Sequence, residues 1–409
     1  MRHLSNAFRW RNALVPCIPT AGRAYSIQAT PGPQITHLAQ RSVLEISGPD
    51  AQKFLKGLTC KDVDGLAGGY SGFMNASDHQ GRLLHSIFVF PTGSGYLISH
   101  ESPSSHPHPL HAFLPPFKLR SKVRFKDVSS DYAVFSAWGS DGLEQGSRPQ
   151  RQWKFGSGGA SESIWSWEGG VRNLEVGDAE IGCWDLRAGF GKGSLGRQIL
   201  VPTNKQPSLS SSHETSSLSA YNLHRMLLGV PEGMDELVPG TALPLESDLD
   251  IHGGVDFRKG CYLGQELTVR TYHTGATRKR ILPVRLYPLD AEFDPSSSKL
   301  PEIAHHFPLP LEITYHPPKS SASQKPKSAG KVVSLHDVYS VGLGLVRIEM
   351  AEKSWWTGER EDRGRLRVRV GDVEYGVWVG KGEALGAAME EEQRRREEKE
   401  AAAVVGDGS

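Results

Sequence analysis

The densest group of chemically capable residues in this chain surrounds one cysteine. The segment Lys259-Gly260-Cys261-Tyr262-Leu263-Gly264-Gln265-Glu266 places Cys261 between two glycines and shortly after a lysine. Glycine lets a backbone turn sharply and approach a ligand closely. Cations near a thiol favour the thiolate, the form that attacks electrophiles or binds metal. The pattern predicts Lys259 and Cys261 as a functional pair, with a buried cysteine in a tight turn as the alternative.

Polar and glycine residues around this pair extend the candidate site. Gln265 and Glu266 are suited to orienting a neighbouring group or contacting a polar ligand, or else to a structural pairing of Glu266 with an arginine. Arg258 and Arg270 lie close in sequence. The motif residues that accompany the predicted pair are Gly260, Tyr262, Gly264, Gln265, Glu266 and Arg270.

Metal ligation within the chain has little support in the sequence. The four cysteines, Cys17, Cys60, Cys183 and Cys261, are isolated, and no C-x-x-C occurs. We therefore expect no closed four-ligand zinc or iron–sulfur site in this chain, although Cys261 can supply one ligand to a cluster shared with a partner. Four histidines lie in a Ser- and Pro-rich stretch, and we interpret them as loop histidines rather than ligands, because ligands need a rigid support. They are His100, His106, His108 and His111.

A second candidate is a binding group made of one acid and two arginines. Asp185, Arg187 and Arg197 lie within a short span. Arginines in this setting can hold a carboxylate-bearing ligand with two parallel hydrogen bonds. A structural Asp–Arg pair that holds a loop is an equally good interpretation.

Length and charge exclude several classes of protein. The chain has 409 residues and a formal net charge of +1, from 47 basic and 46 acidic residues. It therefore lacks the broad basic field of a nucleic-acid-binding protein. No apolar run approaches the ~20 residues of a membrane-spanning helix. Four cysteines are too few to cross-link a chain of this length by disulfides, so a secreted disulfide-rich scaffold is excluded. We expect a multidomain globular protein with neither nucleic acid nor membrane among its partners.

The N-terminus has the composition of a targeting segment. The first acidic residue is Glu45, whereas arginines occur at positions 2, 9, 11, 23 and 41. A basic, acid-free and potentially amphipathic terminus is typical of a mitochondrial transit peptide. We predict a transit peptide over residues 1–25, a linker over 26–41 and a mitochondrial matrix location. A disordered basic terminus is the alternative.

The remaining chain alternates between periodic segments and breaker-rich tracts. Strand patterns occur at 42–46, 85–90 and 96–99, helix patterns at 51–58 and 218–230, and a hairpin is predicted from 122–128 and 131–138. Low-complexity insertions are predicted at 101–109, 139–163 and 203–217 of a domain spanning 42–285. The C-terminal third alternates like a small antiparallel barrel, with strand patterns at 281–287, 342–349, 366–370 and 373–379. We predict a barrel domain over 286–385 with an insertion at 294–330, and a charged tail over 386–409.

The stretch VDFRKGCYLGQELTVRTYHTGATRKRILPV resembles the signature of the folate-binding YgfZ/GcvT-like family, whose core is K-G-C-Y-x-G-Q-E. The resemblance extends to VLEISGPDAQKFLKGLTCKDV, which ends in Asp62, to the D-x-R and L-G-x-R segments at Asp185 and Leu195, and to YNLHRMLLGVPEGMDELVPGTALP. Together these segments cover most of residues 42–285.

This resemblance implies a fold and a function. The implied fold is α+β, with T-protein-like lobes around a central cavity and a C-terminal antiparallel β-barrel. With an import signal, the resemblance is to the mitochondrial iron–sulfur cluster assembly factors of the family. It implies late maturation of [4Fe-4S] proteins with A-type scaffold proteins as partners, and aconitase-type and radical-SAM enzymes as clients. Asp185, Arg187 and Arg197 become candidates for the cavity that binds tetrahydrofolate in relatives.

One departure from the family bears on catalysis. The aminomethyltransferase branch has G-G-x-x-D-D-L, where a carboxylate faces the folate, and here His85 and Ser86 stand at the corresponding places. Aminomethyl transfer needs a group that manages a proton on nitrogen, so this departure argues against a transferase. Three functions are left: an assembly factor that uses Cys261, a tetrahydrofolate-dependent one-carbon transferase, and a non-catalytic binding module.

Overall fold

The structure is a computed structural model that describes residues 32–406 with internal gaps. The gaps are 65–67, 76–80, 102, 104, 141–147, 168–173, 175, 298, 301, 303–306, 319–324 and 357–363. The predicted transit peptide at 1–25 and part of the linker at 26–41 lie outside the described residues. No helix in the described part of the chain is long and apolar enough to cross a membrane.

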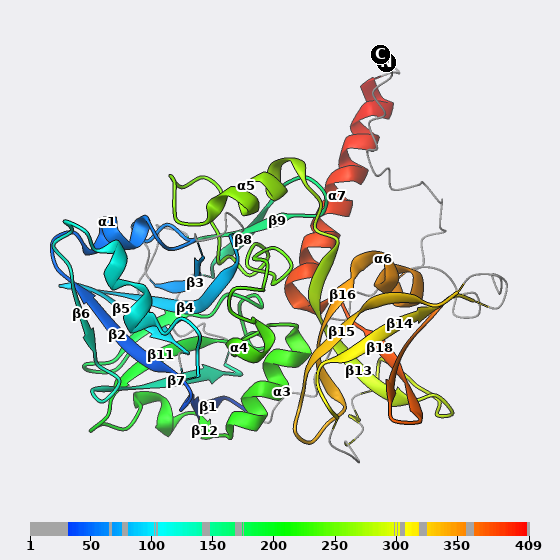
Figure 1. The fold of residues 1–409 in the computed structure, drawn as a ribbon, viewed down its shortest axis with the longest axis horizontal. Coiled ribbons are helices and arrows are strands. Elements are labelled where there is room, and N and C mark those ends of the chain that lie inside the picture. Colours follow the sequence, from blue (N-terminus) through cyan, green and yellow to red (C-terminus); the bar gives the residue numbers. More distant parts are fainter. Residues whose placement is uncertain are drawn as a thin grey trace.

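Two five-stranded sheets form the N-terminal lobes (Figure 1). One has the strand order β3-β4-β5-β2-β6, and the other the order β10-β11-β7-β1-β12. The strands of the first are β2 (Ser42–Ser47), β3 (Gly69–Met74), β4 (Leu83–Thr92), β5 (Gly95–His100) and β6 (Arg124–Asp127). Those of the second are β1 (Gln34–His37), β7 (Tyr132–Trp138), β10 (Ile181–Trp184), β11 (Arg197–Pro202) and β12 (Glu214–Thr215).

Short helices cover these sheets and connect them. They are α1 (Ala51–Lys56), α2 (Leu110–Phe113), the 3-10 turns η1 (Pro115–Phe117) and η3 (Ser208–Ser211), α3 (Leu218–Leu228), α4 (Gly233–Glu236) and α5 (Gln265–Thr274). Helix α3 shows why the sequence folds locally as it does. The Ser217 hydroxyl accepts a hydrogen bond from the Ala220 amide at 3.1 Å, and Gly229 ends the helix at φ +78°. Serine and glycine are preferred at these two ends.

A closed antiparallel barrel forms the C-terminal third, in the strand order β13-β16-β15-β14-β17-β18 (Figure 1). Its strands are β13 (Lys279–Pro288), β14 (Leu311–His316), β15 (Lys327–Leu335), β16 (Val341–Arg347), β17 (Arg365–Val370) and β18 (Val373–Val379), with α6 (Ile348–Ala351) and the π-helical turn η5 (Glu352–Trp356) after β16. The long helix α7 (Gly382–Gly406) leaves the barrel and projects beyond the body of the protein. The predicted α+β class and terminal barrel are confirmed.

Two regional predictions differ from the structure. Residues 122–138 do not form a hairpin, because β6 pairs with β2 and β7 pairs with β1 and β11 in the other sheet. The predicted insertion at 139–163 contains a two-stranded sheet of β8 (Gln150–Phe155) and β9 (Ser161–Ser166). Trp153 and Glu162 of this hairpin are buried, although their surroundings are rich in glycine and serine.

Further differences concern the barrel. It begins with β13 at Lys279 rather than at 286, and the predicted insertion at 294–330 contains β14 and the start of β15. The breaker-rich composition around β14 and the start of β15 hid these two strands, since tracts of proline and serine flank β14 on both sides.

A buried arginine joins the barrel to the lobes. Arg280 on β13 is fully buried and donates to Asp248 Oδ1 at 2.8 Å and to Asp250 Oδ2 at 2.8 Å. It also donates to the carbonyl oxygens of Leu245 and Gly159. Two buried carboxylates therefore depend on one guanidinium, and breaking such a group leaves uncompensated charge in the interior.

We predict that Arg280→Met lowers the unfolding free energy by about 3–5 kcal/mol, because it strands Asp248 and Asp250 without a counter-charge. Urea denaturation followed by tryptophan fluorescence measures the change. The control is Arg347→Met, an exposed arginine on the neighbouring strand β16, which should stay within about 0.5 kcal/mol of the parent. Equal losses of unfolding free energy in Arg280→Met and Arg347→Met would contradict the role of Arg280 as the counter-charge of Asp248 and Asp250.

Candidate functional site

The signature segment forms a loop that leads into helix α5. Its cysteine is exposed, whereas the other two cysteines in the described part of the chain, Cys60 and Cys183, are buried. Burial raises the pKa of the Cys60 thiol to about 12 and raises the pKa of the Cys183 thiol well above its usual value. Among the described cysteines, Cys261 alone offers a thiol to solvent. The alternative of a buried Cys261 in a tight turn is wrong.

Lys259 anchors this loop to the segment that follows helix α1. Its ammonium donates to the carbonyl oxygens of Lys56 at 2.7 Å, Thr59 at 2.5 Å and Lys61 at 3.3 Å. The same ammonium lies 4.8 Å from the centre of the Tyr262 ring, a cation–π arrangement. Burial lowers the pKa of Lys259 to about 8. The predicted pairing of this ammonium with the Cys261 thiol is not among the contacts of the described residues, because its donors are directed at the backbone.

The two glycines beside Cys261 have different roles. Gly264 has φ +78°, and a Cβ there would lie 2.8 Å from the Asn75 carbonyl oxygen. Gly81 approaches from the other side, since its Cβ would lie 2.2 Å from the Gly264 carbonyl oxygen. A side chain at Gly264 is therefore excluded by both conformation and space. A Cβ at Gly260 would meet open space, so the loop does not require glycine there.

Further contacts fix the loop on both sides of the thiol. The Leu263 amide donates to the Gly57 carbonyl at 3.0 Å, and Tyr262 is buried with 5% of its surface exposed. The Gln265 side chain accepts a long hydrogen bond from the Tyr262 amide at 3.4 Å, at the start of α5. Glu266 and Arg270 are exposed on α5. Cys261 is thus an exposed residue on a loop that is held to the protein by its neighbours.

A buried acid behind this loop escaped the sequence analysis. Glu162 on β9 lies 3.8 Å from the Arg258 guanidinium, and burial raises its pKa. Nearby, Lys61 donates to the Gly253 carbonyl at 2.8 Å, and burial lowers its pKa. Glu162 fell inside a predicted insertion. The alternation in Gln150–Phe155 is the signal that would have marked it as part of a hairpin.

Asp185 and Arg187 form a closed ionic group in the core of the lobes. Arg187 donates to Asp185 Oδ1 at 2.9 Å and Oδ2 at 2.6 Å, and it also bonds Glu232 Oε1. Tyr221 donates to the same Glu232 oxygen at 2.8 Å. At most 5% of any of these residues is exposed. The two-pronged carboxylate clamp predicted for Arg187 therefore exists, but the carboxylates that occupy it belong to the protein.

The charge of Glu232 depends on this group. Burial alone would raise its pKa, but the neighbouring guanidinium groups, with Arg187 first among them, hold the pKa down at about 2.

Arg197 on β11 is placed differently, with 2% of its surface exposed and its guanidinium 5.5 Å from the Trp184 ring centre. It donates to the Ser140 hydroxyl at 3.3 Å.

Of the four histidines in the Ser- and Pro-rich stretch, His100 and His106 are buried, whereas His108 and His111 are exposed. His85 on β4 stacks on His106 with ring centroids 4.3 Å apart, and Phe73 and Phe113 lie beside it. Burial lowers the pKa of His85 to about 3 and that of His100 to about 4. The loop interpretation is wrong for His100, which ends strand β5, whereas His106 lies in a loop but is buried. In the described part of the chain, no three or more His, Cys, Asp or Glu side chains gather as a metal group.

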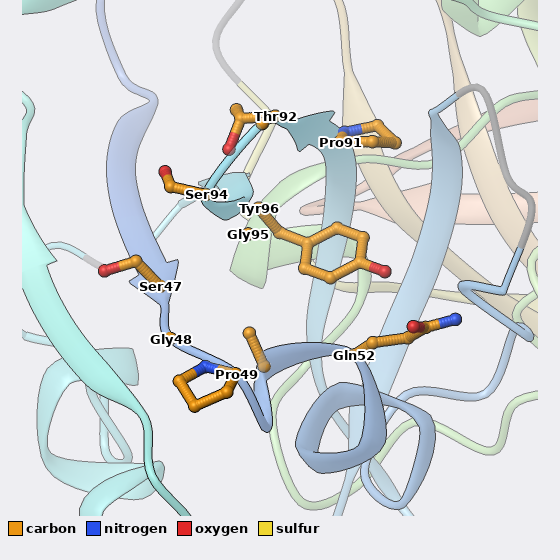
Figure 2. Close-up of a pocket in the computed structure, with 11 residues that line it drawn as sticks. Ser47, Gly48, Pro49, Gln52, Pro91, Thr92, Ser94, Gly95 and Tyr96 are labelled. Atoms are coloured by element: carbon orange, nitrogen blue, oxygen red, sulfur yellow. The ribbon is translucent and has the colours of Figure 1, made fainter.

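A surface cavity of about 570 Å³ lies apart from the signature residues. It opens between the start of α1 and the turn that joins β4 to β5. Figure 2 shows the Tyr96 ring beside it, with Ser47, Thr92 and Ser94 around the opening. None of the predicted site residues lines this cavity.

Comparison with known proteins identifies the family. No protein-family model matches the chain. The iron–sulfur cluster assembly factor IBA57 homolog, mitochondrial, of Cryptococcus neoformans var. neoformans is 61% identical over 377 residues, which cover 88% of this chain and 98% of that protein. The chain belongs to this family of mitochondrial iron–sulfur cluster assembly factors.

More distant similarities agree with this assignment. The IBA57 homolog of Coccidioides immitis is 36% identical over 363 residues, which cover 80% of this chain and 75% of that protein. Among solved structures, the aminomethyltransferase T of the glycine cleavage system from Bartonella henselae matches with a TM-score of 0.54 and 12% identity, over 85% of each chain. The predicted T-protein-like fold is confirmed, and so are the predicted role in iron–sulfur cluster assembly and the mitochondrial location.

We predict that Lys259→Met lowers the unfolding free energy by about 2–3 kcal/mol, since carbonyl oxygens lose a charged donor. The rate at which iodoacetamide alkylates Cys261 in the folded protein should stay within about twofold, because the ammonium serves the backbone. Peptide mass spectrometry measures alkylation, and urea unfolding measures stability. Lys325→Met, which removes an exposed cation just before β15, is the control. A large fall in alkylation with unchanged stability would instead support the thiol–ammonium pairing.

The Glu232 group predicts a pH dependence of stability. A carboxyl with a lowered pKa in the folded state stabilises the fold above its unfolded pKa, and this contribution is lost as the pH falls toward the folded value. Glu232→Gln should therefore be less stable than the parent near pH 6, and the difference should narrow steadily below about pH 4.5. Thermal unfolding across this range measures it, with the exposed Glu312→Gln as control. A stability difference between Glu232→Gln and the parent that does not change with pH would refute the prediction.

Proposed function

We propose that this protein supports the late assembly of [4Fe-4S] proteins in the mitochondrial matrix by presenting the Cys261 thiol to a cluster carried by an A-type scaffold protein. Family membership supports the general role. The observation that carries the specific role is that Cys261 is exposed while the residues around it are tied to the lobe. Exposure lets the thiol reach a partner, and the anchored backbone fixes where it is presented.

The chemistry requires a partner. A thiol must lose its proton to bind iron as the thiolate, and an iron–sulfur cluster takes about four such ligands. Cys261 supplies one ligand from this chain, and the scaffold supplies the others together with the cluster, which is the cargo of the reaction. The loop enters the N-terminus of α5, and Arg258 is exposed nearby. Both features favour negative charge on a ligand bound there.

The rigidity of the loop is the protein's own contribution. Lys259 holds the N-terminal side of Cys261, while the Leu263 amide and the crowded Gly264 hold the C-terminal side. A ligand held in one geometry loses little conformational freedom when a cluster is shared or handed over. Aconitase-type and radical-SAM enzymes are the clients that we propose.

Tetrahydrofolate does not fit the described residues that resemblance suggested for it. Arg187 is already paired with two carboxylates of this chain, Asp185 and Glu232, and Arg197 is buried against Trp184. His85, at the place of the family's carboxylate, is packed among aromatic rings and has a pKa far below neutrality. It is therefore a poor proton acceptor at pH 7. These observations favour the assembly role over aminomethyl transfer.

The test is complementation of mitochondria that lack the endogenous protein. We expect Cys261→Ser to lower aconitase activity by about tenfold while a [2Fe-2S] enzyme keeps its activity, because only cluster assembly of the [4Fe-4S] type uses the thiol. Cys183→Ala removes a buried thiol and serves as control, with immunoblots to establish abundance. Equal loss of both enzyme classes would overturn the proposal. Full activity of Cys261→Ser and Cys261→Ala would favour the non-catalytic binding module.

A further inference from the structure

A basic turn on the first lobe has a leucine at its apex. The turn follows η1 and precedes β6, and the Ser121 amide donates to the Lys118 carbonyl at 2.8 Å to close it. Leu119 lies at its second position with φ +45°, and 88% of its surface is exposed. We call residues 118–124 the basic turn.

The position of Leu119 is unfavourable in the isolated protein. A left-handed backbone conformation brings Cβ against the following carbonyl, so glycine and asparagine usually occupy it. A bulky residue there is strained, and strain at an exposed position gains nothing from internal packing. Leu119 is at the same time the most exposed of the protein's large exposed apolar side chains in the described residues. Strain and exposure together point to a contact made outside this chain.

The charges around Leu119 indicate the nature of that contact. Lys118, Arg120, Lys122 and Arg124 are exposed and make no ion pair within the described residues. Further along β6, Lys126 is paired with Asp131 at 3.3 Å. Asp50 accepts a hydrogen bond from the Lys122 backbone amide at 2.6 Å and is an acid beside this group. The basic turn therefore presents four unpaired cations on both sides of one apolar side chain.

We propose that the basic turn binds the surface of an anionic phospholipid bilayer, with Leu119 inserted between the headgroups and the four cations on lipid phosphates. Polybasic segments bind anionic membranes, and an inserted apolar side chain adds to their affinity. A protein interface usually buries a central cluster of several apolar or aromatic residues. The basic turn offers a single apolar residue at a projecting apex, which suits a lipid surface better.

This contact is peripheral. It agrees with the finding that the described residues contain no membrane-spanning helix, and it revises the expectation from net charge that membranes are not partners. A near-neutral chain can still have a local field, since charge is screened within roughly 10 Å. A membrane contact at the first lobe places the protein beside a bilayer without using Cys261.

The experiment is co-sedimentation of the purified protein with vesicles. The probe is a vesicle of phosphatidylcholine with cardiolipin, compared with phosphatidylcholine alone. We expect binding to the anionic vesicles only, weakened by salt. Lys118→Gln/Arg120→Gln should lower binding about ten- to thirtyfold, as two surface cations are lost. Leu119→Asn should lower it about fivefold, while raising the thermal unfolding midpoint because asparagine tolerates the left-handed conformation.

Matched controls separate this contact from general charge attraction. Lys325→Gln/Lys327→Gln removes two exposed cations from the barrel, and Val373→Thr removes an exposed apolar side chain there. Neither should change binding by more than about twofold. Equal binding to neutral vesicles, equal effects of the barrel variants, or unchanged binding by Leu119→Asn would each overturn the proposal. Retention on soluble polyglutamate without any binding to vesicles would assign the turn to an acidic protein instead.

Discussion

The position of Cys261 depends on the Lys259 ammonium, which donates its hydrogen bonds to backbone carbonyl oxygens. The Lys259 ammonium bonds three carbonyl groups from residues 56–61, which satisfies acceptors at the end of α1 and ties the signature loop to the lobe. An exposed loop would otherwise be free to move, because few apolar contacts hold it. The protein thereby keeps one thiol in solvent and fixes its location, a combination that neither burial nor a flexible loop provides.

The interior of the lobes is arranged around arginines that are already paired. Arg187 joins Asp185 and Glu232, and Arg280 joins Asp248 and Asp250. Buried charges of this kind must be matched one against another, since each ion loses its hydration. A guanidinium that is already paired with two carboxylates of its own chain has no strong remaining attraction for a ligand carboxylate. The fold shared with an aminomethyltransferase is therefore compatible with an interior whose charges mainly maintain structure, as folds host many functions.

Sequence reasoning succeeded where the pattern itself carries the information. The signature segment, the helix at 218–230, the strands around positions 85 and 96, and four barrel strands follow from residue types and spacing. It failed where the partner of a residue decides the outcome. Lys259 stands near Cys261 in sequence, but its ammonium is directed toward carbonyls of a different segment. The pairing of 122–128 with 131–138 failed because each strand joined another sheet, and Glu162 was missed because its hairpin is stabilised by tertiary contacts.

The same structure explains how the departure at His85 and the retained cysteine segment coexist. Gly81 and Gly264 meet through their backbones, so the entry to β4 supports the signature loop without any side-chain chemistry. Farther along β4, His85 turns into an aromatic cluster with Phe73 and Phe113 and stays neutral. Support of the loop thus requires only that the backbone at Gly81 stay in place. The side chain at position 85 does not contribute to this support. His85 can therefore replace the carboxylate without loosening the loop that carries Cys261.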